Sequence, residues 1–333
     1  MIPTGLAFLL AVPLWAQQAR YELPAEQRTG AIKRIWVVCH SHLDIGFTRP
    51  PDEVARDYKD NIDHAIQLAR ENDDFRWTIE STWMLEQWLK RTDDPALVRE
   101  LGKLMRAGRI TLGAAFANMH SGLMAPEESN RLVYLAEKFR RRFGIETPVA
   151  FQNDVPGFTW AYPRVFASSG VKYLVTGLNL FIGGGNNLGM GKDPLYWAGP
   201  DGSRVLTWFT YDSYVEGYRW RLRGGSQIAE LEQTAPRRLA WLEQNGYKYD
   251  TYLLMASPGD NADPQGAFRI LESIRAWNQK HPELPMKMVA AEEFFTYLIG
   301  KYGDDFASAA GDATGNWERS GGTIVRPAYL VPP

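Results

Sequence analysis

The chain lacks disulfide-forming cysteines, membrane-length apolar runs and an excess of charge of either sign. Cys39 is the only cysteine among 333 residues, which excludes an intrachain disulfide. No run reaches the 18 or so apolar residues of a membrane-spanning helix, so we expect no membrane span. The 37 Lys and Arg nearly balance the 39 Asp and Glu, leaving a net charge of -2. This balance provides no electrostatic basis for binding nucleic acid or acidic membranes.

A short apolar run from Leu6 to Ala16 resembles the hydrophobic part of a secretory signal, with small Ala16 near a cleavage position. The run has no Lys or Arg before it, and a short buried or interfacial helix is the alternative. We expect residues 1–16 to be a signal peptide and the protein to be secreted or periplasmic. Export without disulfides is typical of a bacterial periplasm or cell surface.

The rest of the chain alternates strand and helix patterns. Apolar residues make up 45% of the sequence, and the apolar run at 34–40 reads as a strand buried on both faces. Helical patterns follow at 52–71 and at 126–144, and such units recur as far as 292–302. This order predicts an α/β fold with a parallel sheet, and seven or eight strands favour a closed or nearly closed barrel over residues 30–302. Residues 303–333 are rich in Gly, Ala and Pro, which indicates a linker or the beginning of a following domain.

Polar side chains recur directly after the predicted strands. The carboxyl ends of strands in such folds gather at one edge and carry the ligand sites. We therefore expect these side chains to converge on one cleft; they include His40, His42, Asp44, Glu80, Asn118, His120, Asp154, Asp260 and Asp263.

The segment "HSHLDIG" (40–46) is the best candidate for a metal site. Residues two apart in an extended segment point to the same side, so His40, His42 and Asp44 can face one point. An imidazole and a carboxylate are a good ligand pair for zinc. Hydrogen-bonded histidines at a strand end remain the alternative.

Asp154 follows a strand and precedes a Pro-Gly turn, where a fixed carboxylate suits a nucleophile or a metal ligand. A helix cap is the alternative, although Thr159 is better positioned for that role. Cleavage of a glycosidic bond needs a second carboxylate, which Asp260 or Asp263 offers. A simple turn aspartate is the alternative for both.

Aromatic residues are plentiful, with 12 Trp, 15 Tyr and 15 Phe, and flat rings suit sugar binding, although most aromatics serve the core. We expect the substrate to be a carbohydrate. Its predicted contacts are His40, Phe47, Glu80, Trp83, His120, Trp160 and Tyr211.

Four segments, in matching order and spacing, resemble glycoside hydrolase family 38, the α-mannosidases: "HSHLDIGFT" (40–48), "FANMHSGLMAPEES" (116–129), "FQNDVPGFT" (151–159) and "SPGDNADP" (257–264). The resemblance covers roughly residues 33–300 and implies a seven-stranded β/α barrel. It implies one zinc ion held by His42, Asp44 and Asp154, with Asp154 also the nucleophile of a retaining mechanism.

Two departures from the family concern the proton donor and the metal. The donor would be Asp260 or Asp263, because Asn261 stands where the family often has a second Asp. The family takes its fourth zinc ligand from a downstream histidine, whereas no His follows His281 here. The alternatives are a truncated gene product, substitution by His40 or His120, or weak zinc binding.

Two other functions remain open. A zinc-dependent carbohydrate deacetylase would use the metal to activate water, but it usually needs an H-x-x-x-H pair, which the sequence lacks. A truncated barrel that binds glycans without cleaving them is the other alternative. The sequence does not predict the oligomeric state.

Overall fold

The computed structural model describes residues 28–155, 157–177, 193–210, 213–225 and 228–313. Within these ranges no helix has the length and apolar character needed to cross a membrane. The predicted signal peptide at 1–16 and the predicted substrate contact Tyr211 lie outside the described residues.

The first strand is central to the fold. β1 (Arg34–Cys39) pairs in parallel with β8 (Thr251–Ala256) along its whole length and with β9 (Met286–Met288) along part of it. Strands flanked and covered on both faces read as continuous apolar runs, and the side chains of Ile35 and Val37 are accordingly fully buried.

Two further sheets complete the strand arrangement. The larger has the order β10-β6-β7-β5-β4, in which only the β6–β7 pair is antiparallel. The smaller is a parallel pair, β2 with β3. The bounds are β2 (Trp77–Ile79), β3 (Ile110–Leu112), β4 (Val149–Asn153), β5 (Tyr173–Gly177), β6 (Leu195–Ala198), β7 (Arg204–Phe209) and β10 (Ser308–Ala310).

Single contacts join the three sheets in chain order. An isolated bridge between His40 and Thr78 connects β1 to β2, and the backbone N–H of Ala114 donates to the carbonyl of Val149 between β3 and β4. No pairing of β7 with β8 forms in the part of the chain that the structure describes. The predicted α/β fold is confirmed, whereas a closed seven-stranded barrel stays a prediction, because the hydrogen-bonded strands do not form one ring.

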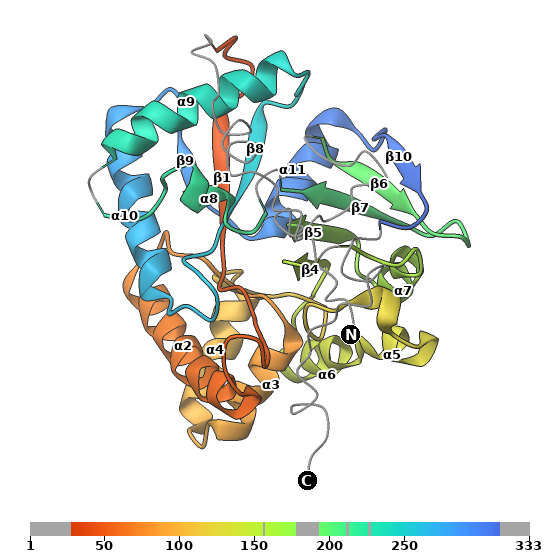
Figure 1. Cartoon of the computed structure of the whole chain (residues 1–333). Coiled ribbons are helices and arrows are strands. Elements are labelled where there is room, and N and C mark those ends of the chain that lie inside the picture. Colours follow the sequence, from red (N-terminus) through yellow and green to blue (C-terminus); the bar gives the residue numbers. More distant parts are fainter. Residues whose placement is uncertain (1–27, 156, 178–192, 211–212, 226–227, 314–333) are drawn as a thin grey trace, which may run out of the picture.

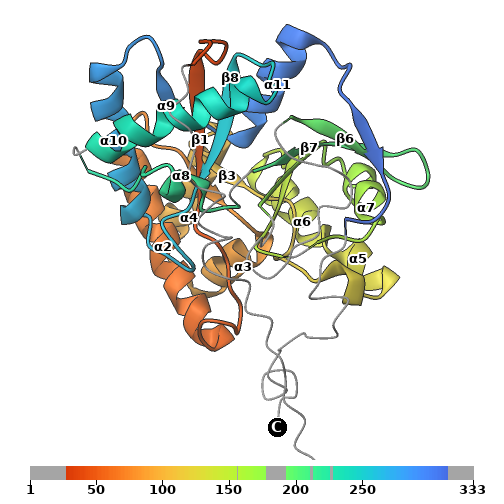
Figure 2. The same cartoon turned by 45° about the horizontal axis from the view of Figure 1, so that its top comes forward.

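Helices lie around the strands (Figures 1 and 2). Helix α2 begins with Pro51 and two acidic residues, Asp52 and Glu53, which suit a helix N-terminus. The bounds are α2 (Pro51–Glu71), α3 (Thr82–Arg91), α4 (Pro95–Arg106), η1 (Ser121–Leu123), α5 (Pro126–Arg131), α6 (Tyr134–Phe143), α7 (Tyr162–Ser168), α8 (Glu216–Arg219), α9 (Ala229–Gln244), α10 (Gln265–Lys280) and α11 (Ala291–Tyr302).

The structure differs from the sequence prediction in two places. The helix predicted at 126–144 is interrupted between α5 and α6, where the carbonyl of Leu132 accepts a hydrogen bond from Phe116 instead of continuing the helix. The fold also continues beyond 302, because β10 pairs with β6 and Ala313 forms a bridge with Phe158. Residues 308–310 therefore form an edge strand of the sheet.

Candidate metal and catalytic centre

The imidazole of His42 lies at the centre of the candidate site. His42 follows β1 and is only 1% exposed. Its Nε2 atom lies 3.5 Å from Oδ1 of Asp44 and 3.8 Å from Oδ2 of Asp154. The ends of β1 and β4 thus bring His42 next to the two carboxylates that the family resemblance places with it in one metal site.

The loop that carries Asp44 is fixed by Asn261. The Asn261 side chain accepts a hydrogen bond from the Asp44 backbone N–H at 3.1 Å and donates to the Asp44 carbonyl at 3.0 Å and to Oγ1 of Thr48 at 2.8 Å. Its own N–H donates to the carbonyl of His42 at 2.7 Å. Asn261 has φ 49°, a left-handed conformation that Asn tolerates better than most residues. The amide at this position therefore holds the loop in place.

Asp154 directly follows β4 in an unusual backbone conformation. Its φ is 55°, and its N–H donates to the carbonyl of Gly177 at the end of β5 at 2.8 Å. A Cβ atom on Gly177 would lie 2.4 Å from the backbone nitrogen of Tyr214, so this close approach requires glycine. Strained residues of this kind are concentrated at functional sites.

Asp260 joins the group from the loop after β8. One ligand atom from each of His42, Asp44 and Asp260 lies within 4.8 Å of the others. The hydroxyl of Tyr214 donates to Oδ1 of Asp260 at 2.6 Å, and the Tyr214 ring stacks on His42 with centroids 4.2 Å apart. No local sequence pattern marks Tyr214, because its role depends on the packing of its ring against His42.

The donor atoms suit a zinc ion. Zinc binds His nitrogen and carboxylate oxygen at 2.0–2.2 Å with tetrahedral geometry, which separates two ligand atoms by about 3.4 Å. The distances of 3.5 and 3.8 Å from His42 Nε2 to Asp44 and Asp154 are close to this value. The ligand atoms that all lie within 4.8 Å of one another belong to His42, Asp44 and Asp260, and Asp154 lies beside His42. The residues present therefore fit a zinc ion, with Asp260 as a further candidate ligand.

Carboxylates dominate the electrostatics of the site. Burial lowers the pKa of His42, but the charge of Glu80 and hydrogen bonds with Asp44 and Glu80 outweigh burial and hold this pKa well above its usual value. Burial raises the pKa of Tyr214, and the charge of Asp154 and the hydrogen bond to Asp260 raise it further. Tyr214 is therefore a neutral hydrogen-bond donor, in a setting that attracts cations.

Three of the predicted substrate contacts lie in the interior. His40 and Glu80 have no exposed surface, and Trp83 is 8% exposed with its ring edge against Tyr58. His40 lies with Nδ1 3.3 Å from Oε1 of Glu80 and stacks on Phe151. Their burial places these side chains behind the site, where they support it and do not present a surface to a substrate.

The other predicted contacts have more exposed positions. Phe47 is 82% exposed, Trp160 is 36% exposed with its indole N–H bonded to the carbonyl of Ala198, and His120 is partly buried, which lowers its pKa.

Asp263, the other predicted proton donor, has partners outside the group formed by His42, Asp44, Asp154 and Asp260. Its carboxylate lies 2.8 Å from Nδ1 of His64 and accepts the backbone N–H of Gln265 at the start of α10.

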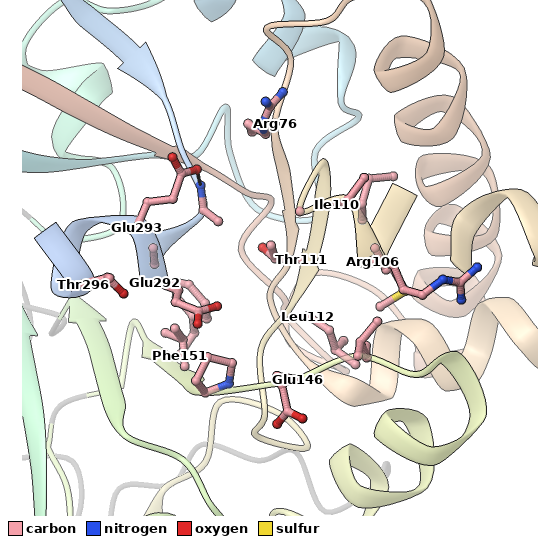
Figure 3. Close-up of a pocket in the computed structure, with 18 of the residues that line it drawn as sticks. Arg76, Arg106, Ile110, Thr111, Leu112, Glu146, Phe151, Glu292, Glu293 and Thr296 are labelled. Atoms are coloured by element: carbon pink, nitrogen blue, oxygen red, sulfur yellow. Dashed lines mark hydrogen bonds between the residues drawn. The ribbon is translucent and has the colours of Figure 1, made fainter. Parts of the chain in front are cut away.

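A cavity of about 1060 Å³ lies beside β3, between the first part of β4 and the start of α11 (Figure 3). Figure 3 shows Glu292 and Glu293, from the start of α11, across the cavity from Arg106 at the end of α4. Among the described residues, the lining of this cavity includes none of His42, Asp44, Asp154 and Asp260. The cavity is therefore separate from the candidate site.

These features define an α/β domain with an acidic, histidine-containing site at the carboxyl ends of its strands. Residues 33–312 match the family described as "Glycosyl hydrolases family 38 N-terminal domain", and the chain belongs to this family. The resemblance seen in the four sequence segments is thus confirmed. A search of curated protein sequences finds no match.

Solved structures show the same fold. An α-mannosidase from Enterococcus faecalis V583 aligns over 84% of this chain and 31% of its own, with a TM-score of 0.69 and 16% identity. A glycosyl hydrolase family 38 protein from Enterococcus faecalis aligns over 84% and 29%, with a TM-score of 0.62 and 15% identity. A 4-α-glucanotransferase from Thermococcus litoralis aligns over 86% and 41%, with a TM-score of 0.54 and 11% identity. The chain spans about a third of the length of the first two.

Proposed function

We propose that this chain is the catalytic domain of a zinc-dependent, retaining glycoside hydrolase that acts on α-mannosides. Membership of glycosyl hydrolase family 38 and the likeness to an α-mannosidase fold support the proposal. The proposal depends mainly on one observation: Nε2 of His42 lies within 3.8 Å of a carboxylate oxygen of Asp44 and of Asp154. This arrangement places the proposed nucleophile at the proposed metal site.

In this proposal His42, Asp44 and Asp154 hold the zinc ion. A zinc ion held there would coordinate sugar hydroxyls and would favour the distorted ring of an oxocarbenium-like transition state. The Asp154 carboxylate attacks the anomeric carbon while the leaving oxygen takes a proton from an acid, and water then cleaves the resulting ester. The left-handed backbone of Asp154 and its N–H bond to Gly177 fix the attacking carboxylate.

Asp260 is the better candidate of the two for the acid. It is exposed, it lies beside His42 and Asp44, and Tyr214 fixes its orientation, whereas Asp263 is bound to His64 and α10. The variant Asp260→Asn should retain zinc and lose turnover. Loss of zinc in this variant would instead assign Asp260 as the fourth metal ligand, in place of the family's downstream histidine.

The metal part of the proposal is tested by elemental analysis of the purified chain, wild type beside His42→Ala. We expect close to one zinc per chain in the wild type and loss of that zinc in the variant, with hydrolysis of an aryl α-mannoside by the wild type alone. Zinc and mannoside binding without hydrolysis would favour the glycan-binding alternative. Release of acetate from an acetylated glycan would favour the deacetylase.

We also propose that the protein is exported, on the pattern of residues 1–16 alone. Amino-terminal sequencing of the protein recovered from its native compartment checks this, since removal of the segment would be visible directly.

A further inference from the structure

Glu80 lies just after β2 with no exposed surface, and its carboxylate contacts several parts of the candidate site. Its Oε2 atom accepts the backbone N–H of Leu43 at 2.8 Å and the side-chain amide of Asn118 at 2.9 Å. Leu43 stands between His42 and Asp44, so this oxygen anchors the segment that carries both residues.

The second oxygen of Glu80 faces the histidines and β4. Oε1 accepts the side-chain amide of Asn153 at 2.6 Å and lies 3.5 Å from Nδ1 of His42 and 3.3 Å from Nδ1 of His40. Asn153 directly precedes Asp154. One buried carboxylate therefore contacts the ring of His42 and the residue next to the proposed nucleophile.

Two asparagines extend this network across the neighbouring strands. Oδ1 of Asn118 accepts the backbone N–H of Asn153 at 2.7 Å, and Oδ1 of Asn153 accepts the backbone N–H of Gly177 at 2.8 Å. Gly177 in turn accepts the N–H of Asp154. The polar groups between Glu80 and Asp154 are thus connected by hydrogen bonds from the end of β2 to the end of β5.

A buried carboxylate is costly unless its oxygens are satisfied, and here they accept hydrogen bonds from the site's own framework. A histidine that binds a metal through one ring nitrogen usually has the other nitrogen bonded to a carboxylate or carbonyl, which orients the ring. His42 has this arrangement, since Nδ1 faces Glu80 and Nε2 faces Asp44 and Asp154.

We propose that Glu80 is a positioning residue that holds the ring of His42 and the Asn153–Asp154 segment in a fixed relation for metal binding. The proposal rests on the metal site of the proposed function. It replaces the substrate contact that the sequence predicted for Glu80, because a fully buried side chain presents no surface to a sugar.

The test is the zinc affinity of Glu80→Gln, measured on the metal-free full chain by competition with a chromophoric chelator. Glutamine keeps the shape but presents an NH₂ group to a set of donors, so we expect zinc to bind about 10- to 100-fold more weakly. The visible spectrum of the Co²⁺-loaded variant should also differ from wild type, because the ligand field changes when the imidazole is misplaced.

Glu243→Gln is the matched control. Glu243 lies in α9, far from the site, and is also a buried carboxylate. It accepts hydrogen bonds from the backbone N–H groups of Thr29, Gly30 and Ile32. This variant should lose stability and keep both the zinc affinity and the Co²⁺ spectrum. Should Glu80→Gln fail to fold, Asn118→Ala removes one donor to the same carboxylate and should weaken zinc binding a few-fold.

The outcomes separate this proposal from the proposed function. Wild-type zinc affinity and an unchanged Co²⁺ spectrum in Glu80→Gln would overturn the role of Glu80 and leave the zinc site intact. Weaker zinc binding by Glu80→Gln, together with a zinc-loaded wild type that hydrolyses no α-mannoside, would support the role of Glu80 and overturn the proposed activity. A wild type that binds neither zinc nor Co²⁺ would overturn both.

Discussion

Asp154 adopts a backbone conformation that few aspartates adopt, and this shapes its best test. Asparagine tolerates the left-handed region as aspartate does, so Asp154→Asn should keep the fold while it removes the nucleophilic oxygen. We expect turnover of an aryl α-mannoside to fall by a factor of about 10³ or more. Unchanged circular dichroism and melting temperature serve as the control, and substantial remaining turnover would remove Asp154 from the nucleophile role.

Asn261 offers a second prediction at a single position. Alanine there loses the side-chain bonds to Asp44 and Thr48 and must occupy φ 49° without them. We expect Asn261→Ala to lower the free energy of unfolding by about 1–3 kcal/mol and to weaken zinc binding. Denaturant titration and chelator competition measure the two effects. Asn261→Asp is the comparison, since it keeps an acceptor for the Asp44 N–H, and equal behaviour of all three proteins would contradict the proposed role.

The sequence predicted the central group of the site because two simple rules apply there. Residues two apart in an extended segment face one way, which brings His42 and Asp44 together, and carboxyl ends of parallel strands meet, which adds Asp154 and Asp260. The rules do not say which polar side chain turns inward. The sequence therefore predicts Glu80 to be a substrate contact, although the structure buries it completely.

Among the elements, α9 is tied to the segment before β1 by Glu243. Burial raises the pKa of Glu243, but bonds from the backbone of Ile32 and Gly30 and the charge of Arg28 outweigh it and lower this pKa below 4.5. The ionised form therefore stabilises the fold above pH 4.5, and this contribution is lost as the pH falls through the lowered folded-state pKa.

We expect Glu243→Gln to cost about 2 kcal/mol of unfolding free energy at pH 7 and to differ less from wild type below pH 4. Urea titrations between pH 3 and 7 measure the difference. A gap between the two proteins that is the same at every pH would show that the charge of Glu243 contributes nothing.

The sequence predicted the elements that have clear periodicity and missed those whose pairing is remote. β1 and α2 lie within one residue of their predicted bounds, because an apolar run and a helical stripe are local signals. β10 pairs with β6, more than 100 positions away, and carries the small residues Ser308–Ala310 without a local strand pattern. Such an edge strand is recognised only once its partner is in place.

For the molecule as a whole, a metal that joins the ends of several strands should stabilise the folded state. Zinc at 100 times its dissociation constant should add about 2.7 kcal/mol to the free energy of unfolding. The melting temperature should therefore rise when zinc is added to the metal-free protein and stay unchanged in His42→Ala. An equal rise in both proteins would place the stabilising zinc elsewhere.

The position of β1 between β8 and β9 has a consequence for the synthesis of the protein on the ribosome. Arg34 and its ion-pair partner Asp250, at the adjoining ends of β1 and β8, are 216 positions apart. At roughly 5–20 residues per second, a ribosome takes about 10–40 s to make that interval. Throughout that time the first strand, among the most apolar of the chain, has left the ribosome without its neighbours, which makes it a natural binding segment for a chaperone during synthesis.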